Sequence, residues 1–425
     1  MSQPQDSVDA PTPQSLDHES APLPSHIPAL DGLRGLAILL VTIYRFSPGP
    51  SDDSLVGQWL FSIMHTWTCG VDLFFVLSGF LITGILFDTK EKDGYLVNFF
   101  GRRSLRIFPL YFAVLAIAFL LFPLLGITVF APQQPHQAWL WCYGTNIFQS
   151  IQGSWCLGPF DHFWSLAVEE HFYLVWPLVI GCLSRTSAMR TCVAIIIASV
   201  VGRVGWMLAG GNEVTPSVLT LFRADALAVG AWLALAVRDR RGIANLATAA
   251  WTTLVITGLL LIPVLAMDRR LMMIPEALLA WFFGSLLLLA VMDRGESWLG
   301  WLWNNRFLQW LSKYGYGMYV YQNLLIPIMA PLVTSKLLCD LLGSALLGRL
   351  CYIGIMSTLT FAVAAVSWHC FEERILRLKE FFSSAPDVAT APKEQQHVGA
   401  ENASLTVESG LSAAADQRSA DATAL

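Results

Sequence analysis

The chain has 425 residues, of which 55% are hydrophobic and only 13% are charged. A soluble domain carries about 25% charged residues, so water is not the solvent of most of this protein's surface. The formal net charge is −5, and no basic stripe is interleaved with aromatic residues, which argues against nucleic acid as a partner. None of the cysteines forms a CxxC pair, so no metal site is expected.

Long apolar segments recur along the chain and predict an all-α, polytopic membrane protein with about ten transmembrane helices. The predicted helices span residues 33–50, 70–88, 107–126, 164–183, 191–209, 219–237, 249–266, 273–292, 315–334 and 347–370. They define a membrane domain over residues 30–382. The flanks, residues 1–29 and 383–425, are polar and are predicted to be disordered. The first flank lacks the pattern of a cleavable signal peptide.

Lys and Arg are unevenly distributed over the predicted loops. They gather around residues 89–106, 184–190, 238–241, 294–313 and 374–379. The loops over residues 51–69 and 127–163 contain none. Because positive residues stay on the cytoplasmic side, we expect a protein of the cytoplasmic (inner) membrane with both termini in the cytoplasm. The loop 127–163 is then outside, and the lipid bilayer is a partner.

The loop 127–163 is rich in aromatic residues: Trp139, Trp141, Tyr143, Trp155 and Phe160. One interpretation is a belt of aromatic side chains at the membrane interface. The other is a surface on which a sugar or a lipid carrier stacks.

Ionisable groups in membrane helices are expensive and are candidate functional groups. Arg34 and Arg45 lie eleven residues apart in the first predicted helix, so both side chains point to the same face. The alternative is that Arg45 lies near the outer boundary and extends to water. Arg223 and Asp225, in the sixth predicted helix, indicate a buried structural ion pair within that helix or with a neighbour.

Three arginines precede the third predicted apolar helix, at Arg102, Arg103 and Arg106. Their spacing of three and four places them on one helical face, where guanidinium groups are able to clamp phosphate oxygens. On spacing alone, a topology signal with anionic lipid contact is the better explanation.

A cluster of ionisable residues lies in "HFWSLAVEEHFYLVWP", residues 162–177. A carboxylate such as Glu169, shielded by aromatic side chains, is suited to acid or base catalysis. His171 is a candidate partner, although consecutive side chains point about 100° apart. The alternative is a cluster of interfacial charges.

Seven motifs carry a resemblance to a known family. In chain order they are "LDGLRGLAILLV", "GVDLFFVLSGFLITGIL", "RRSLRIFPLY", "FWSLAVEEHFYLVWPL", "RADALAVG", "YGYGMYVYQ" and "SWHCFEERIL". Over residues 28–382 the sequence resembles the acyltransferase-3 family of integral membrane O-acyltransferases. The resemblance implies transfer of an acyl group from cytoplasmic acyl-CoA, acetyl-CoA above all, to a hydroxyl of an extracytoplasmic or lipid-linked carbohydrate. Acyl-CoA is then the co-substrate.

The resemblance also implies residue roles. Arg34, Arg102, Arg103 and Arg106 are expected to bind the donor, and Glu169 matches the acidic residue of the fourth-helix motif. The candidate catalytic residues are Glu169, Arg45 and His171.

Two positions depart from the family pattern. Arg45 stands where the family has its histidine, the expected general base, and arginine stays protonated. Gln322 stands where many members carry histidine.

Three interpretations follow. The first is an active enzyme in which Glu169, His65 or His171 is the base, or in which Arg45 stabilises an oxyanion. The second is an impaired relative that binds a donor or a partner. The third is a transporter, for which no inverted repeat is evident.

Overall fold

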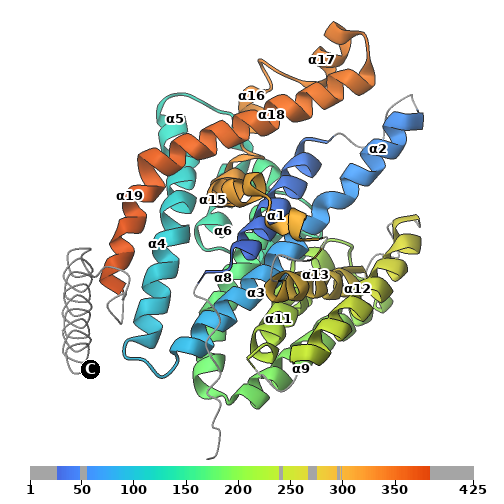
Figure 1. Ribbon diagram of the computed structural model, residues 1–425. Coiled ribbons are helices and arrows are strands. Elements are labelled where there is room, and N and C mark those ends of the chain that lie inside the picture. Colours follow the sequence, from blue (N-terminus) through green and yellow to red (C-terminus); the bar gives the residue numbers. More distant parts are fainter. Residues whose placement is uncertain are drawn as a thin grey trace, which may run out of the picture. The chain divides into compact units, whose positions relative to one another are not determined.

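The computed structural model describes residues 26–47, 55–238, 243–266, 275–293, 297 and 299–382. Within these residues every regular element is helical (Figure 1). The predicted all-α fold is therefore confirmed. The predicted disordered flanks lie outside the described residues, except for residues 26–29, and α1 begins at Pro28.

Ten long helices overlap the ten predicted ranges. They are α1 (Pro28–Phe46), α3 (Gly70–Thr89), α4 (Tyr95–Ala116), α8 (Phe163–Cys182), α9 (Arg185–Leu208), α11 (Thr220–Ala236), α12 (Ile243–Ala266), α13 (Pro275–Met292), α15 (Arg306–Tyr321) and α18 (Ala345–Ser367). Shorter helices connect and extend them: α2 (Leu55–Thr66), η1 (Trp67–Cys69), η2 (Ile117–Leu121), α5 (Phe122–Leu124), η3 (Ala131–His136), α6 (Gln137–Trp141), α7 (Thr145–Gln152), η4 (Gly158–Phe160), α10 (Thr215–Val218), α14 (Gly300–Trp303), α16 (Leu325–Met329), α17 (Ser335–Leu342), η7 (Trp368–Glu372), α19 (Glu373–Leu376) and η8 (Arg377–Phe382).

Fewer helices than predicted meet the length and hydropathy of a membrane span among the described residues. Among the described residues, 6 helical segments are long and apolar enough to cross a membrane: Leu55–Thr89, Tyr95–Leu124, Arg185–Leu208, Thr215–Ala236, Leu246–Pro263 and Ala345–Phe382. The predicted count of about ten is therefore not confirmed. The helices α1 and α8 carry candidate site residues with charged side chains, and these lower the mean hydropathy of both helices. The helix α15 has only 16 residues, which is short for a membrane span. The charged residues of the candidate site thus also reduce the hydropathy by which a membrane span is recognised.

Glycines bring two pairs of helices into backbone contact. A Cβ atom added to Gly79 of α3 would lie 1.9 Å from the carbonyl oxygen of Leu227, and one added to Gly230 of α11 would lie 2.0 Å from that of Val76. Gly32 and Gly35 of α1 approach α14 and α15 in the same way. Small residues allow such close packing inside a membrane. These contacts fix α3 against α11 and α1 against α15 (Figure 1).

The aromatic loop folds back onto α4 and η2. Tyr143 stacks on Tyr111 with 4.1 Å between the ring centroids, and Phe160 stacks on Phe119 at 5.1 Å. Both Tyr143 and Phe160 are buried, whereas Trp155 is 51% exposed. At least two of the loop's aromatic residues therefore serve in packing, and Trp155 is the one with a large exposed ring.

Candidate active site

A cavity of about 190 Å³ is lined by residues of α1, α3, α4, α8 and α15. Most of its wall is apolar, from side chains such as Phe74, Leu81 and Ile107. The charged residues in the wall are Arg34, Arg103, Arg106, Glu169 and Glu170. The fold thus brings together four of the predicted site residues, which come from three helices far apart in the sequence.

Glu169 is held in a fixed position by α3. The hydroxyl of Ser78 donates a hydrogen bond of 2.5 Å to Glu169 Oε1, and the hydroxyl of Tyr173 donates to Ser78 Oγ at 3.0 Å. Ser78 and Glu169 both line the cavity. One carboxylate oxygen therefore accepts a hydrogen bond from α3, which fixes the carboxylate in the cavity wall. Sequence reasoning missed Ser78, although it lies within the quoted motif of the second predicted helix.

Arg103 is the cation beside this carboxylate. Its guanidinium carbon lies 4.0 Å from the centre of the Tyr173 ring, and it interacts electrostatically with Glu169 and Glu170. Its Nε is buried without a hydrogen-bond partner among the described residues. The Oε1 atom of Glu170 is also buried without such a partner. Buried polar atoms of this kind are normally satisfied by a ligand or by water.

A second cavity, of about 230 Å³, shares Arg34, Arg106 and Ser312 with the first. Lys313 and Lys379 add two further cations to its wall, and Asp31 is its carboxylate. Asp31 Oδ1 accepts a hydrogen bond of 2.7 Å from Arg34. The second cavity therefore has four cations against one carboxylate. From the sequence alone, both lysines are interpreted only as topology signals.

The segment that carries Lys379 is held by Arg102. Its Nε donates a hydrogen bond of 2.9 Å to the carbonyl oxygen of Phe382, at the end of η8. Arg102 lines neither cavity. The predicted cluster of three arginines is thus divided: Arg103 and Arg106 line the first cavity, and Arg102 anchors the C-terminal helical segment.

His171 points to another part of the molecule. Its Nδ1 lies 2.8 Å from the hydroxyl of Thr220, which also accepts a hydrogen bond from the Asn146 side chain. His171 is not among the cavity-lining residues. His65 is also outside the lining, and its ring packs on Tyr44 at 5.2 Å between centroids.

Arg45 lies outside the cavity lining, at the end of α1. The contacts of Gly35 with Leu308 and of Ile38 with Gly315 show that α1 and α15 run in the same direction. Arg45 and Gln322 therefore lie at the same end of this helix pair. Gln322 is fully buried, and neither its side-chain nitrogen nor its oxygen has a partner among the described residues.

His162, at the start of α8, is the titratable ring next to Arg45. Its Nε2 faces the carbonyl oxygen of Val320 at 3.3 Å, and its Nδ1 faces the amide nitrogen of Asn323 at 3.2 Å. A carbonyl accepts and an amide nitrogen donates, so Nε2 carries the proton and the ring is neutral. Burial, followed by the charge of Arg45, lowers the pKa of His162 to about 3. Both ring nitrogens are engaged, so His162 is not poised to act as a base.

The predicted Arg223 and Asp225 pair is formed with neighbours rather than within α11. Arg223 binds Asp72 of α3, and Asp225 binds Arg203 of α9, each at 2.5 Å. This cluster is separate from the charged residues of the two cavities.

The fold and the site define a helical membrane protein in which a mainly apolar cavity with carboxylates in its wall shares lining residues with a cationic cavity. The acyltransferase-domain profile of the acyltransferase-3 family matches residues 27–369. The chain therefore belongs to this family, as the seven motifs predicted. No solved structure matches this chain.

Three curated relatives illustrate the similarity. The O-acetyltransferase OatA of Staphylococcus aureus is 34% identical over 178 residues, which is 38% of this chain and 26% of the relative. The putative peptidoglycan O-acetyltransferase YrhL of Bacillus subtilis is 28% identical over 329 residues, 72% of this chain and 49% of the relative. The peptidoglycan O-acetyltransferase OatA of Listeria monocytogenes is 25% identical over 334 residues, 72% of this chain and 50% of the relative. The matches thus span half or less of these relatives' lengths.

Proposed function

We propose that the protein transfers an acyl group, acetyl in the first instance, from cytoplasmic acyl-CoA to a hydroxyl of an extracytoplasmic or lipid-linked carbohydrate. The observation that carries this proposal is the pair of adjacent cavities that share Arg34, Arg106 and Ser312, one cationic and one apolar with Glu169 in its wall. The names of the relatives favour a peptidoglycan-type glycan as the acceptor. The distribution of Lys and Arg supports a cytoplasmic membrane location with both termini in the cytoplasm.

The two cavities suit the two ends of an acyl-CoA molecule. The second cavity carries Arg34, Arg106, Lys313 and Lys379, and such groups bind phosphate oxygens. The first cavity is mainly apolar and fits the acyl end of the chain. The positively charged segments are predicted to be cytoplasmic, which agrees with entry of the donor from that side.

Glu169 is the proposed general base. Ser78 donates to Oε1 and orients the carboxylate, which accepts the proton of the acceptor hydroxyl in this scheme. The hydroxyl oxygen attacks the thioester carbonyl, the carbon–sulfur bond breaks, and Glu169 returns the proton to the leaving thiol. This scheme needs no histidine at position 45, where Arg45 lies outside the cavity lining.

Arg103 is the proposed stabiliser of the oxyanion that forms on the thioester carbonyl. Two tyrosines of the cavity wall already donate their hydroxyl hydrogens elsewhere: Tyr316 to the carbonyl oxygen of Ile107, and Tyr319 to that of His162. Arg103 has an Nε without a partner among the described residues and interacts with Glu169. It is thus the cavity donor best placed to take a developing negative charge.

A second candidate function is a relative that binds the donor without turnover. It is favoured by Arg45 and Gln322, which replace the two histidines of the family pattern. The two functions differ in whether a labelled acetyl group reaches a glycan.

The test uses the purified full-length chain in lipid vesicles with radiolabelled acetyl-CoA and peptidoglycan fragments or lipid-linked precursors. The proposal expects label on the glycan together with release of free coenzyme A in equal amount. Binding of acetyl-CoA without any labelled product, under conditions in which a peptidoglycan O-acetyltransferase labels the same acceptors, would favour the second function. Uptake of labelled solute without acyl transfer would favour a transporter.

A further inference from the structure

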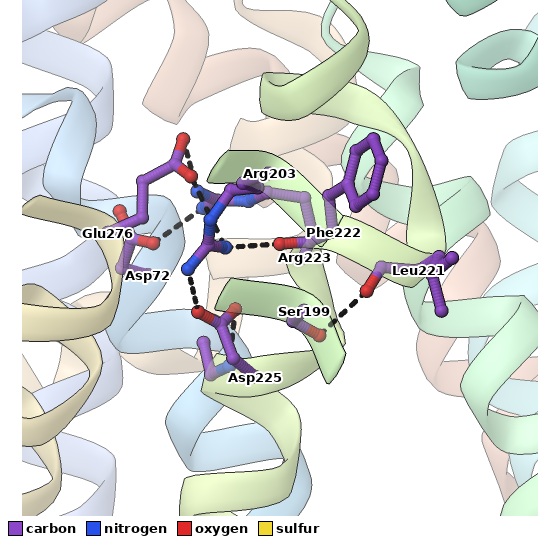
Figure 2. Close-up of polar contacts among 9 residues, drawn as sticks. Asp72, Ser199, Arg203, Leu221, Phe222, Arg223, Asp225 and Glu276 are labelled. Atoms are coloured by element: carbon purple, nitrogen blue, oxygen red, sulfur yellow. Dashed lines mark hydrogen bonds and ion pairs between the residues drawn. The ribbon is translucent and has the colours of Figure 1, made fainter. Parts of the chain in front are cut away.

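A buried charge cluster lies outside the two cavities and is not used by the proposed acyl transfer. It joins Asp72 of α3, Arg203 of α9, Arg223 and Asp225 of α11, and Glu276 of α13. Figure 2 shows the two guanidinium groups among the three carboxyl groups. The side chains of the two arginines are 0% and 4% exposed, those of the two aspartates 7% and 2%, and that of Glu276 18%.

The contacts tie four helices together. Arg203 binds Asp225 at 2.5 Å and donates to the carbonyl oxygen of Phe222. Arg223 binds Asp72 at 2.5 Å. Glu276 bridges the two arginines, with its Oε1 at 2.7 Å from Arg223 and its Oε2 at 3.4 Å from Arg203.

The charges in this cluster do not balance. Two guanidinium groups face three carboxyl groups, so the cluster carries one excess negative charge if all five groups are ionised. A buried charge without a partner is strongly unfavourable, and a buried acid is neutralised by a proton instead. One of the three carboxyl groups is therefore expected to hold a proton.

The hydrogen bonds indicate which carboxyl group this is. Both oxygens of Asp225 accept hydrogen bonds, one from Arg203 and one from the backbone N–H of Ala226. Asp72 has a contact of 2.5 Å with Arg223. Glu276 is different because its Oε2 has no hydrogen-bond partner among the described residues. Glu276 is also the most exposed of the five side chains, which allows exchange of a proton.

We propose that Glu276 is a proton-binding site inside the helical bundle and that its proton balances the Arg203 and Arg223 cluster. Loss of the proton leaves an excess negative charge between Asp72 and Asp225. That repulsion acts on α13 against α3 and α11, so the docking of α13 depends on pH.

The groups that face Glu276 are the four cluster residues already named. The helix α12 also packs on α13, and it has no titratable residue between Leu246 and Ala266. The helix α1 packs on α13 as well, but its Asp31 and Arg34 pair with each other, and Arg45 interacts with His162. Residues 267–274, which precede α13 and include Arg269 and Arg270, are outside the described residues.

The cluster adjoins the first cavity through one layer of aromatic rings. The guanidinium carbon of Arg223 lies 5.6 Å from the ring centres of both Phe75 and Trp164. Phe75 also lines the first cavity. The proposed proton site is nevertheless independent of the proposed acyl transfer, because neither its charge balance nor its test involves the donor.

The first test is infrared spectroscopy of the full chain in lipid, with exchange into heavy water to identify protonated carboxyl groups. We expect the wild type to show protonated-carboxyl absorption at neutral pH, and Glu276→Gln to lose the intensity of one carboxyl group. Glu213→Gln is the matched control, because Glu213 is exposed, and it should keep the full absorption. A wild type without this absorption, or a Glu276→Gln variant with the same intensity as the wild type, would overturn the proposal.

The second test is thermal unfolding from neutral to alkaline pH. A neutral glutamine resembles the protonated glutamate, and it avoids the cost of holding a proton that the unfolded glutamate has already released at neutral pH. Glu276→Gln should therefore unfold at or above the wild-type midpoint at neutral pH and lose less stability in alkali. Asp225→Asn should unfold at a lower temperature, because it leaves Arg203 without its carboxylate. A Glu276→Gln variant as unstable as Asp225→Asn, or one that does not fold, would mean that Glu276 is ionised and would overturn the proposal.

Discussion

Replacing Gly79 by alanine tests whether the backbone contact between α3 and α11 holds the site in place. The added Cβ would lie 1.9 Å from the carbonyl oxygen of Leu227, and ordinary contact begins at 3.4 Å, so the helices have to separate by about 1.5 Å. Overpacking of this kind lowers the free energy of unfolding by about 1–3 kcal/mol. Ser78 precedes Gly79, so the same separation moves the hydroxyl group that binds Glu169.

The assay is unfolding of the purified protein in lipid, measured beside acetyl transfer. Gly205→Ala in α9 and Gly354→Ala in α18 are matched controls, because nothing lies within 4 Å of their added Cβ atoms. At those positions alanine raises helix propensity and stabilises by up to about 1 kcal/mol. We expect Gly79→Ala to lose both stability and transfer. A Gly79→Ala variant as stable as the two controls would refute the reasoning.

The remaining predictions concern the site and its surroundings. Ser78→Ala should lower kcat about 10- to 100-fold, which is the loss expected for a hydrogen bond to a charged group. Ser78→Thr keeps the hydroxyl and should retain most of the rate. Equal losses in the two variants would argue against a role of Ser78 in positioning Glu169. Lys313→Gln and Lys379→Gln should each raise KM for acetyl-CoA by a factor of about two to five with little change in kcat, and Lys336→Gln on α17 should leave both constants unchanged. Acid should destabilise the protein through His162, because the unfolded ring binds a proton below pH 6.5 while the pKa of the folded ring is about 3. The free energy of unfolding then falls by about 1.4 kcal/mol per pH unit between these values, and an unchanged acid slope in His162→Gln would contradict a neutral His162.

Helix positions could be predicted from sequence because apolar length is a local property. Each of the ten predicted ranges overlaps a helix. Membrane spans were harder to count, since the charges of Glu169 and Glu170 in α8 lower the hydropathy of the helix that carries them.

Partners across helices could not be predicted from one sequence. The spacing of Arg102, Arg103 and Arg106 indicates a shared face, but the C-terminal segment takes Arg102 out of the site. Ser78 and Glu276 gave no signal by themselves, because their roles depend on groups that lie far away in the chain. Arg45 and Gln322 stood out as departures from a family pattern, and the structure adds that both lie at one end of the α1–α15 pair.

The central claim is that Glu169 performs the proton transfer although position 45 carries no histidine. The most direct test is acetyl transfer by Glu169→Gln and by Arg45→Gln, with acetyl-CoA binding measured in both variants. The claim predicts a loss of about 10²- to 10⁴-fold in kcat for Glu169→Gln, with donor binding kept, and a much smaller loss for Arg45→Gln. Wild-type turnover in Glu169→Gln, or a loss confined to Arg45→Gln, would contradict it.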